Sequence, residues 1–356
     1  MTMHQPTRTR RGFSLIELLV TIAVIAIVIA ILVPTLSGAR NTARAAGSQA
    51  QLTEIGQASS QYFSDNQRLP GYFTPRQMGS SDNEGRGFSG MQNIMLDLAG
   101  GIVEGPAEGN VIEVGPDDDN TVFVDLTFIG TTEAGGGYYT PRDTSFVAQN
   151  DPDVGLQETD GDEEARRLPS VLDSFNTPIL AWQRDRTAIQ PIEELADFVQ
   201  DESGGDVPAR FYWASNAGFL KTTDLGKRGK DPTFSTSAAS REFSLIGEGV
   251  NEDPELLNHL AVLLGSPSVP NPGDNADALQ APSAARGDLI LHSAGIDAMY
   301  MSSKDIGGGG DLRFWQSFFV DPPTGSSDER IQDGSGQVES IDLLDRFDDL
   351  IETVGN

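Results

Sequence analysis

Several residue types and motifs are missing from this chain, and each absence removes a class of function. The 356 residues contain no cysteine, which excludes disulfides and thiolate sites. The three histidines, His4, His259 and His292, lack the spacing typical of a metal site. Gly-x-Ser-x-Gly does not occur, and Gly307–Gly310 lacks the Gly-Lys-Ser/Thr ending of a phosphate loop. The sequence therefore offers no catalytic constellation, and we expect the protein not to be an enzyme.

Basic residues are also scarce. The chain has 24 Lys and Arg against 53 Asp and Glu, a net charge of −29. Such a surface repels nucleic acid and anionic lipid headgroups, while it favours solubility and cation binding. We therefore expect no nucleic-acid partner. The length allows a membrane span together with one large or two modest soluble domains.

One long hydrophobic run stands out from the rest of the sequence. Between Phe13 and Pro34 the residues that are not apolar are Ser14, Glu17, Thr21 and Pro34 itself. As a helix this stretch would span about 33 Å, enough to cross a bilayer. A carboxylate inside such a span costs roughly 2.5–3.5 kcal/mol on insertion scales. The presence of Glu17 therefore needs an explanation.

The residues around the start of this run carry a resemblance to a known family. Arginines precede Gly12-Phe13-Ser14-Leu15-Ile16-Glu17, and the string resembles the processing site of type IV prepilins, which include type II secretion pseudopilins. The resemblance implies cleavage by a membrane peptidase after Gly12 and methylation of Phe13 as the new N-terminus. It also implies that Glu17 meets the N-terminal amine of a neighbouring subunit. An ammonium partner would offset part of the desolvation penalty of a lone carboxylate.

The same resemblance implies a set of partners and a location. The partners are a prepilin peptidase/methyltransferase, other pilin-like subunits, an inner-membrane assembly platform and membrane lipid. The chain would cross the inner membrane once, with its head in the periplasm, and would assemble into a type II secretion pseudopilus or a type IV pilus. The arginines on either side of the span favour this orientation only modestly.

Three other interpretations of the segment stay open from the sequence. It could be an ordinary signal anchor, or a twin-arginine leader around Thr9–Phe13 with a cleavage site at Ser37-Gly38-Ala39. It could also anchor or export a binding protein or enzyme and serve only for targeting. An export signal gains nothing from a carboxylate in its apolar core, and this run is longer than a usual signal core. The pilin-like interpretation is therefore preferred.

The helix is expected to resume beyond Pro34. Leu52, Ile55, Ser59, Tyr62 and Phe63 fall near one face at helical spacing. Residues 13–64 thus look like one helix, which Pro34 should kink or loosen by one hydrogen bond. We divide the chain into a leader (1–12), a transmembrane and assembly helix (13–34), an amphipathic continuation (35–65) and an extracytoplasmic head (66–356).

The head is expected to be α+β, with the long helix packed on an antiparallel sheet and joined by Gly/Asp-rich loops. The segment from Ser170 to Trp182 resembles the aspartate–aromatic–Pro strand entry of major pseudopilins. The other predicted strands are 111–114, 121–129, 210–214 and 289–292, and the predicted helices are 192–199, 254–264 and 341–354. The predicted solvated acidic loops are Asp117–Asn120 and Asp151–Glu164.

A candidate cation site follows the strand at 289–292. Ser293-Ala294-Gly295-Ile296-Asp297 and the Gly-rich loop behind it resemble the C-terminal loop that encloses calcium in major pseudopilins. Ser293, Asp297, Asp305 and Asp311 could supply hydroxyl, carbonyl and carboxylate oxygens, the ligands that calcium prefers. Met299-Tyr300-Met301 and Lys304 depart from the family pattern. The alternative is a solvated turn between strands.

Three further residues are interpreted as structural. His292 lies on an apolar strand and is interpreted as a buried, satisfied histidine. Trp182 and Trp315 are interpreted as core residues.

Overall fold

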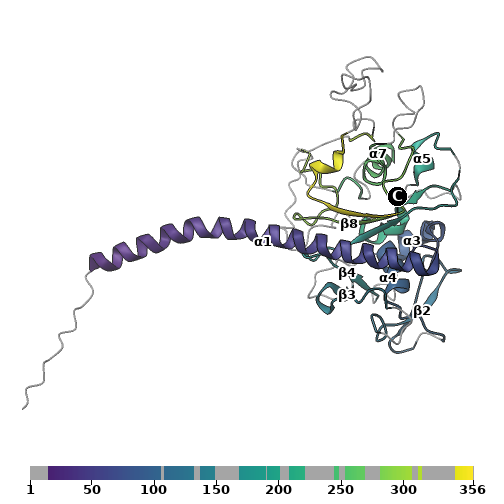
Figure 1. Ribbon diagram of the computed structural model, residues 1–356, viewed down its shortest axis with the longest axis horizontal. Coiled ribbons are helices and arrows are strands. Elements are labelled where there is room, and N and C mark those ends of the chain that lie inside the picture. The colour runs from purple at the N-terminus through teal and green to yellow at the C-terminus, as the bar shows by residue number, and fades with distance from the viewer. Residues whose placement is uncertain are drawn as a thin grey trace, which may run out of the picture. The chain divides into compact units, whose positions relative to one another are not determined.

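The computed structural model of the chain describes residues 15–105, 108–131, 137–148, 168–189, 191–200, 208–220, 244–247, 253–268, 281–306, 312–314 and 341–355. The chain divides into two compact units, Met1–Arg44 and Ala45–Asn356. A long N-terminal helix is followed by small, mostly antiparallel sheets and short helices, so the predicted α+β class is confirmed (Figure 1). The segment Asp151–Glu164 and Trp315 lie outside the described residues.

The first unit is the apolar start of α1 (Leu15–Asn66). The side chains from Leu15 to Leu32 are all exposed. An 18-residue window here has a mean hydropathy of 3.1, so by length and composition the helix could cross a membrane. The helix runs through Pro34 without interruption, which agrees with the single helix predicted over 13–64.

In the second unit, the later part of α1 packs on a three-stranded sheet. Leu52, Ile55, Ala58 and Tyr62 are buried at intervals of three and four residues. The apolar face that they form contacts sheet residues such as Leu291 within one hydrophobic cluster. The packing on the sheet therefore explains the amphipathic pattern in the sequence.

The sheet has the strand order β5 (Leu180–Gln183), β8 (Leu289–Ser293), β9 (Leu350–Val354), and both pairs are antiparallel. The central strand β8 is buried along its whole length. Leu289 and Leu291 belong to the cluster with α1, whereas Ile290 belongs to a cluster that includes α7 (Asp253–Leu264). The sheet thus lies between α1 and α7, as Figure 1 shows.

The other described elements pack on the two faces of this sheet or belong to a third hydrophobic cluster. That third cluster packs the hairpin of β1 (Val111–Val114) and β2 (Val122–Asp125) against helix α4 (Gly90–Leu98). The remaining elements are α2 (Pro75–Met78), α3 (Ser81–Arg86), η2 (Asp143–Ser145), β3 (Phe146–Ala148), β4 (Pro169–Val171), α5 (Leu195–Phe198), β6 (Val199–Gln200), β7 (Phe211–Tyr212), η4 (Trp213–Asn216), α6 (Ala217–Leu220) and the 3-10 helix η8 (Leu343–Arg346).

The predicted terminal helix over 341–354 is wrong. The segment instead forms η8 and then β9, which pairs with β8 from Leu350 to Val354. Its apolar residues have helical spacing, but pairing with the buried central strand β8 outweighs that periodicity. The predicted helix at 254–264 and the strands at 111–114 and 289–292 are confirmed. Trp182 is fully buried, as expected of a core residue.

Candidate functional site

The N-terminal candidate residues lie at and before the start of α1. Gly12 and Phe13 fall outside the described residues. Glu17 lies in the first turn of the helix and is exposed. The unpaired N–H groups of a helix N-terminus carry partial positive charge, so this position favours a carboxylate within the chain itself. Thr21 Oγ1 donates to the main-chain oxygen of Glu17 at 2.7 Å and leaves the carboxylate to other partners.

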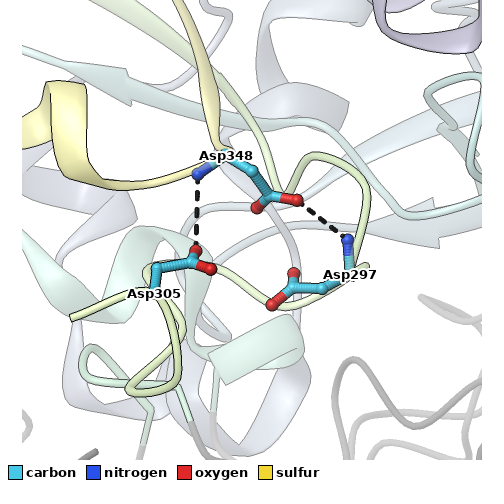
Figure 2. A group of neighbouring side chains, drawn as sticks. All are labelled: Asp297, Asp305 and Asp348. Atoms are coloured by element: carbon cyan, nitrogen blue, oxygen red, sulfur yellow. Dashed lines mark hydrogen bonds between the residues drawn. The ribbon is translucent and has the colours of Figure 1, made fainter. Parts of the chain in front are cut away.

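The second candidate site is a group of three aspartates in the head. Asp297 and Asp305 come from the loop after β8, and Asp348 comes from the segment just before β9. One carboxylate oxygen of each lies within 4.8 Å of the other two. Figure 2 shows the carboxyl groups converging, with the Asp297 N–H donating to Asp348 Oδ2 at 3.1 Å and the Asp348 N–H to Asp305 Oδ2 at 3.3 Å. The group could hold a metal ion such as calcium.

Gly295 lets the two segments of this site approach each other. Its φ is +68°, in the left-handed region that glycine occupies without strain. A Cβ here would lie 2.2 Å from the main-chain oxygen of Asp348. The glycine of the Ser-x-Gly-x-Asp string is therefore required by a close backbone contact.

The neighbouring carboxylates of this site disfavour one another's charge. Burial, followed by the charge of Asp348, raises the pKa of Asp297 to about 7. Burial, followed by the charges of Asp305 and Asp349, raises the pKa of Asp348 to about 6. At neutral pH a bound cation would relieve this repulsion, because it lets all three groups ionise together.

The residues beside the triad hold its loops in place. Asp349 accepts hydrogen bonds from His292 Nε2 at 2.5 Å and from the Met301 N–H at 2.9 Å. His292 is fully buried, as interpreted from the sequence, but its Nδ1 meets no hydrogen-bond partner in the described part of the chain, so it is only half satisfied. Met299, Tyr300 and Met301, which depart from the family pattern, are buried in the head. They anchor the loop through packing.

Of the other two predicted cation ligands, one has a different partner and one lies outside the described residues. The Ser293 hydroxyl donates to Asp173 Oδ2 at 2.6 Å. Asp173 also accepts from the N–H groups of Phe175 and Thr177, so this carboxylate fixes the turn before β5. Asp311 lies outside the described residues.

Asp348 is the member of the triad that the sequence did not reveal. It lies 51 positions after Asp297, in a segment that the apolar spacing favoured as a helix. The only local signal was the Asp348-Asp349 pair that interrupts that apolar pattern. Asp348 is brought to the triad by the long-range pairing of β9 with β8.

Comparison with known proteins bears on the first of these sites. Residues 7–33 match the family model described as the prokaryotic N-terminal methylation motif. The chain carries the prepilin signature. This is the signature of type IV pilins and pseudopilins, and it includes Gly12, Phe13 and Glu17 within its bounds. No curated protein and no solved structure matches the chain.

The methylation motif has direct consequences for this protein. It implies processing by a prepilin peptidase and pilin-like assembly. Together with the exposed apolar start of α1, it indicates membrane anchoring with an extracytoplasmic domain. The motif favours a structural role for the chain.

Proposed function

We propose that this protein is a structural subunit of a type II secretion pseudopilus or a type IV pilus. It is cleaved after Gly12, methylated on Phe13 and assembled through the apolar part of α1, with its head in the periplasm. The observation that carries the proposal is the methylation motif at residues 7–33, which includes the exposed apolar start of α1.

The position of Glu17 supports assembly through a charge pair. Glu17 lies in the first turn of that helix, and removal of the leader would place the new amine of Phe13 just ahead of it. Within a lipid bilayer, a carboxylate and an ammonium ion are each costly alone and less costly as a pair. A pair formed between two copies therefore couples membrane burial to assembly.

Mass spectrometry of the mature chain tests the proposal. The expected N-terminus is methylated Phe13 in cells that contain a prepilin peptidase and intact Met1 in cells that lack it. A mature chain starting near Arg40 would identify an exported protein instead. An intact Met1 in both strains would identify a plain membrane anchor, and either result would contradict the proposal.

We also propose that the aspartate triad binds calcium. Calcium binds six to eight oxygen ligands on flexible loops, and the triad supplies three carboxylates from two chain segments. Bound calcium would join the loop after β8 to the segment that begins β9. Its role would be to stabilise the head.

A further inference from the structure

A cluster of three arginines interrupts the acidic surface of the head. Arg184 and Arg186 follow β5, and Arg210 precedes β7. Main-chain hydrogen bonds bring these positions together: the Arg184 N–H donates to Asp288 O and the Asp185 N–H to Arg210 O, both at 2.8 Å. The cluster is therefore fixed by the backbone.

The carboxylates next to this cluster leave positive charge unbalanced. Asp288 accepts from Arg184 at 3.3 Å and from Arg186 at 2.6 Å, and it is almost buried beneath them. Asp185 accepts from Thr187 and from the Tyr212 hydroxyl. Asp288 thus pairs with two guanidinium groups, whereas Asp185 is hydrogen-bonded to uncharged donors.

Arg210 has no carboxylate partner among the residues that the structure describes. Its side chain donates to the main-chain oxygen of Ser283 at 3.1 Å. Burial and the neighbouring charge of Arg184 both lower the pKa of Arg210. The Nε atoms of Arg184 and Arg210 are buried and meet no acceptor in the described part of the chain. Buried charged donors without acceptors are costly. Both arginine side chains are also part-exposed, so their positive charge is open to an incoming anion.

The surroundings of the pair are typical of a protein interface. Arg186 is half exposed and lies over the ring of Phe63, with 5.5 Å from its Cζ to the ring centroid. Ile189, in the loop just after it, is 88% exposed. Arginine and large apolar side chains presented together are frequent at the energetic centres of interfaces.

We propose that Arg184 and Arg210 bind a carboxylate from an acidic segment of a second copy of this chain. The proposal rests on the proposed function, which brings copies together in a filament. Each copy carries 53 acidic residues, so an acidic segment of a neighbouring copy is locally complementary to this arginine cluster. The net charge of −29 repels nucleic acid, anionic lipid and a second copy alike, so the contact depends on this local pairing.

A photo-crosslinking residue in place of Ile189 tests the proposal in the full-length chain. Cells expressing a mixture of isotopically labelled and unlabelled copies distinguish crosslinks between copies from crosslinks within one. The expected product joins two copies through a peptide rich in Asp and Glu. Its yield should fall as salt is raised, because exposed charges are screened.

Substitutions of the arginine pair make the test specific. Arg184→Gln with Arg210→Gln should reduce the crosslink about tenfold, while the two Lys variants should retain most of it. Arg142→Gln is the matched control, because Arg142 is 74% exposed and pairs with Glu54 outside the cluster. If the double Gln variant does not fold, Arg210→Gln compared with Arg210→Lys gives the same contrast.

Several outcomes would overturn the inference. They are an unchanged yield in the Gln variants, capture of a different protein, crosslinks only within one copy, or binding of free glutamate or inorganic phosphate without capture of a copy. The mature N-terminus is measured in the same cells. Normal processing and filament incorporation without the crosslink overturn this inference alone, whereas absent processing overturns the proposed function.

Discussion

The apolar part of α1 and the head each place carboxylates where their charge is disfavoured. In the helix, a single residue, Glu17, lies among side chains suited to lipid. In the head, Asp297, Asp305 and Asp348 lie within 4.8 Å of one another. Under the proposed function, the first site would take a positive partner from another chain and the second would take one from an ion. A carboxylate in a disfavoured position would then serve assembly in the helix and folding stability in the head.

Of the changes proposed, removal of the Glu17 carboxylate should have the largest effect, and it should impair filament assembly. Glu17→Ala should insert normally but reduce filament incorporation by at least about a hundredfold, because a buried ammonium ion that has lost its partner costs roughly 3–5 kcal/mol. Co-purification of tagged and untagged copies measures this. Thr21→Ala, one turn along the same helix, is the control and should assemble normally. Normal assembly of the Glu17 variant would show that assembly does not require the charge pair.

Within the head, substitution of Gly295 should cause the largest loss of stability, because the glycine lies in a close backbone contact. Gly295→Ala combines a left-handed φ with a Cβ that would lie 2.2 Å from Asp348 O. We expect the free energy of unfolding to fall by about 2–4 kcal/mol, as measured by chemical denaturation. Gly85→Ala is the control, since a Cβ there meets nothing within 4 Å. Equal stability of the two variants would show that the loop can move aside.

Calcium should stabilise the head by a smaller amount. At a hundredfold excess over its dissociation constant a ligand adds about 2.7 kcal/mol, so we expect Tm to rise by about 5 °C and chelator to reverse the rise. Asp348→Asn should abolish the effect, whereas Asp345→Asn, an exposed neighbour in η8, should keep it. Identical melting curves with calcium and with chelator would show that calcium does not stabilise the head through the triad.

The smallest expected effect is on pH dependence in the presence of chelator. The pKa of Asp297 is raised to about 7 and that of Asp348 to about 6, from 3.8, so the native state binds more protons than the unfolded state between these values. Their contribution to stability is therefore complete below about pH 4 and is lost as pH rises towards 7.

Thermal melts between pH 5 and pH 8 check this dependence. Tm in chelator should fall by a few degrees over the range, and calcium should flatten the curve. Asp297→Asn should also flatten it, because the titrating group is gone. A Tm that rises with pH in chelator would contradict the assigned sign.

The two sites differ in how far the sequence alone revealed them. Glu17, Gly12 and Phe13 lie within one contiguous match at residues 7–33, and their chemistry follows from local order along the chain. The apolar face of α1 and the apolar run of β8 were equally readable. A helix buried on one face repeats every 3.6 residues, and a strand buried on both faces reads as a continuous apolar run. Local patterns therefore predicted the helix, several strands and the assembly segment.

The triad required tertiary structure, because its third member comes from a distant segment. Asp348 reaches Asp297 only because β9 pairs with β8 in the register Leu350 to Ser293. The spacing of Ile341, Leu344 and Phe347 favoured a helix there, and no local signal outweighed it. The Ser293 hydroxyl has a different partner for the same reason, since Asp173 is contributed by the turn before β5.

A zero-length carbodiimide crosslink tests the central claim most directly. Applied to membranes that contain isotopically labelled and unlabelled copies, a membrane-permeant carbodiimide joins a carboxylate to an amine in contact with it. The account predicts an amide between Glu17 of one copy and the N-terminal nitrogen of Phe13 in another. A Glu17 that forms no crosslink to a neighbouring copy, in chains that do begin at Phe13, would contradict it.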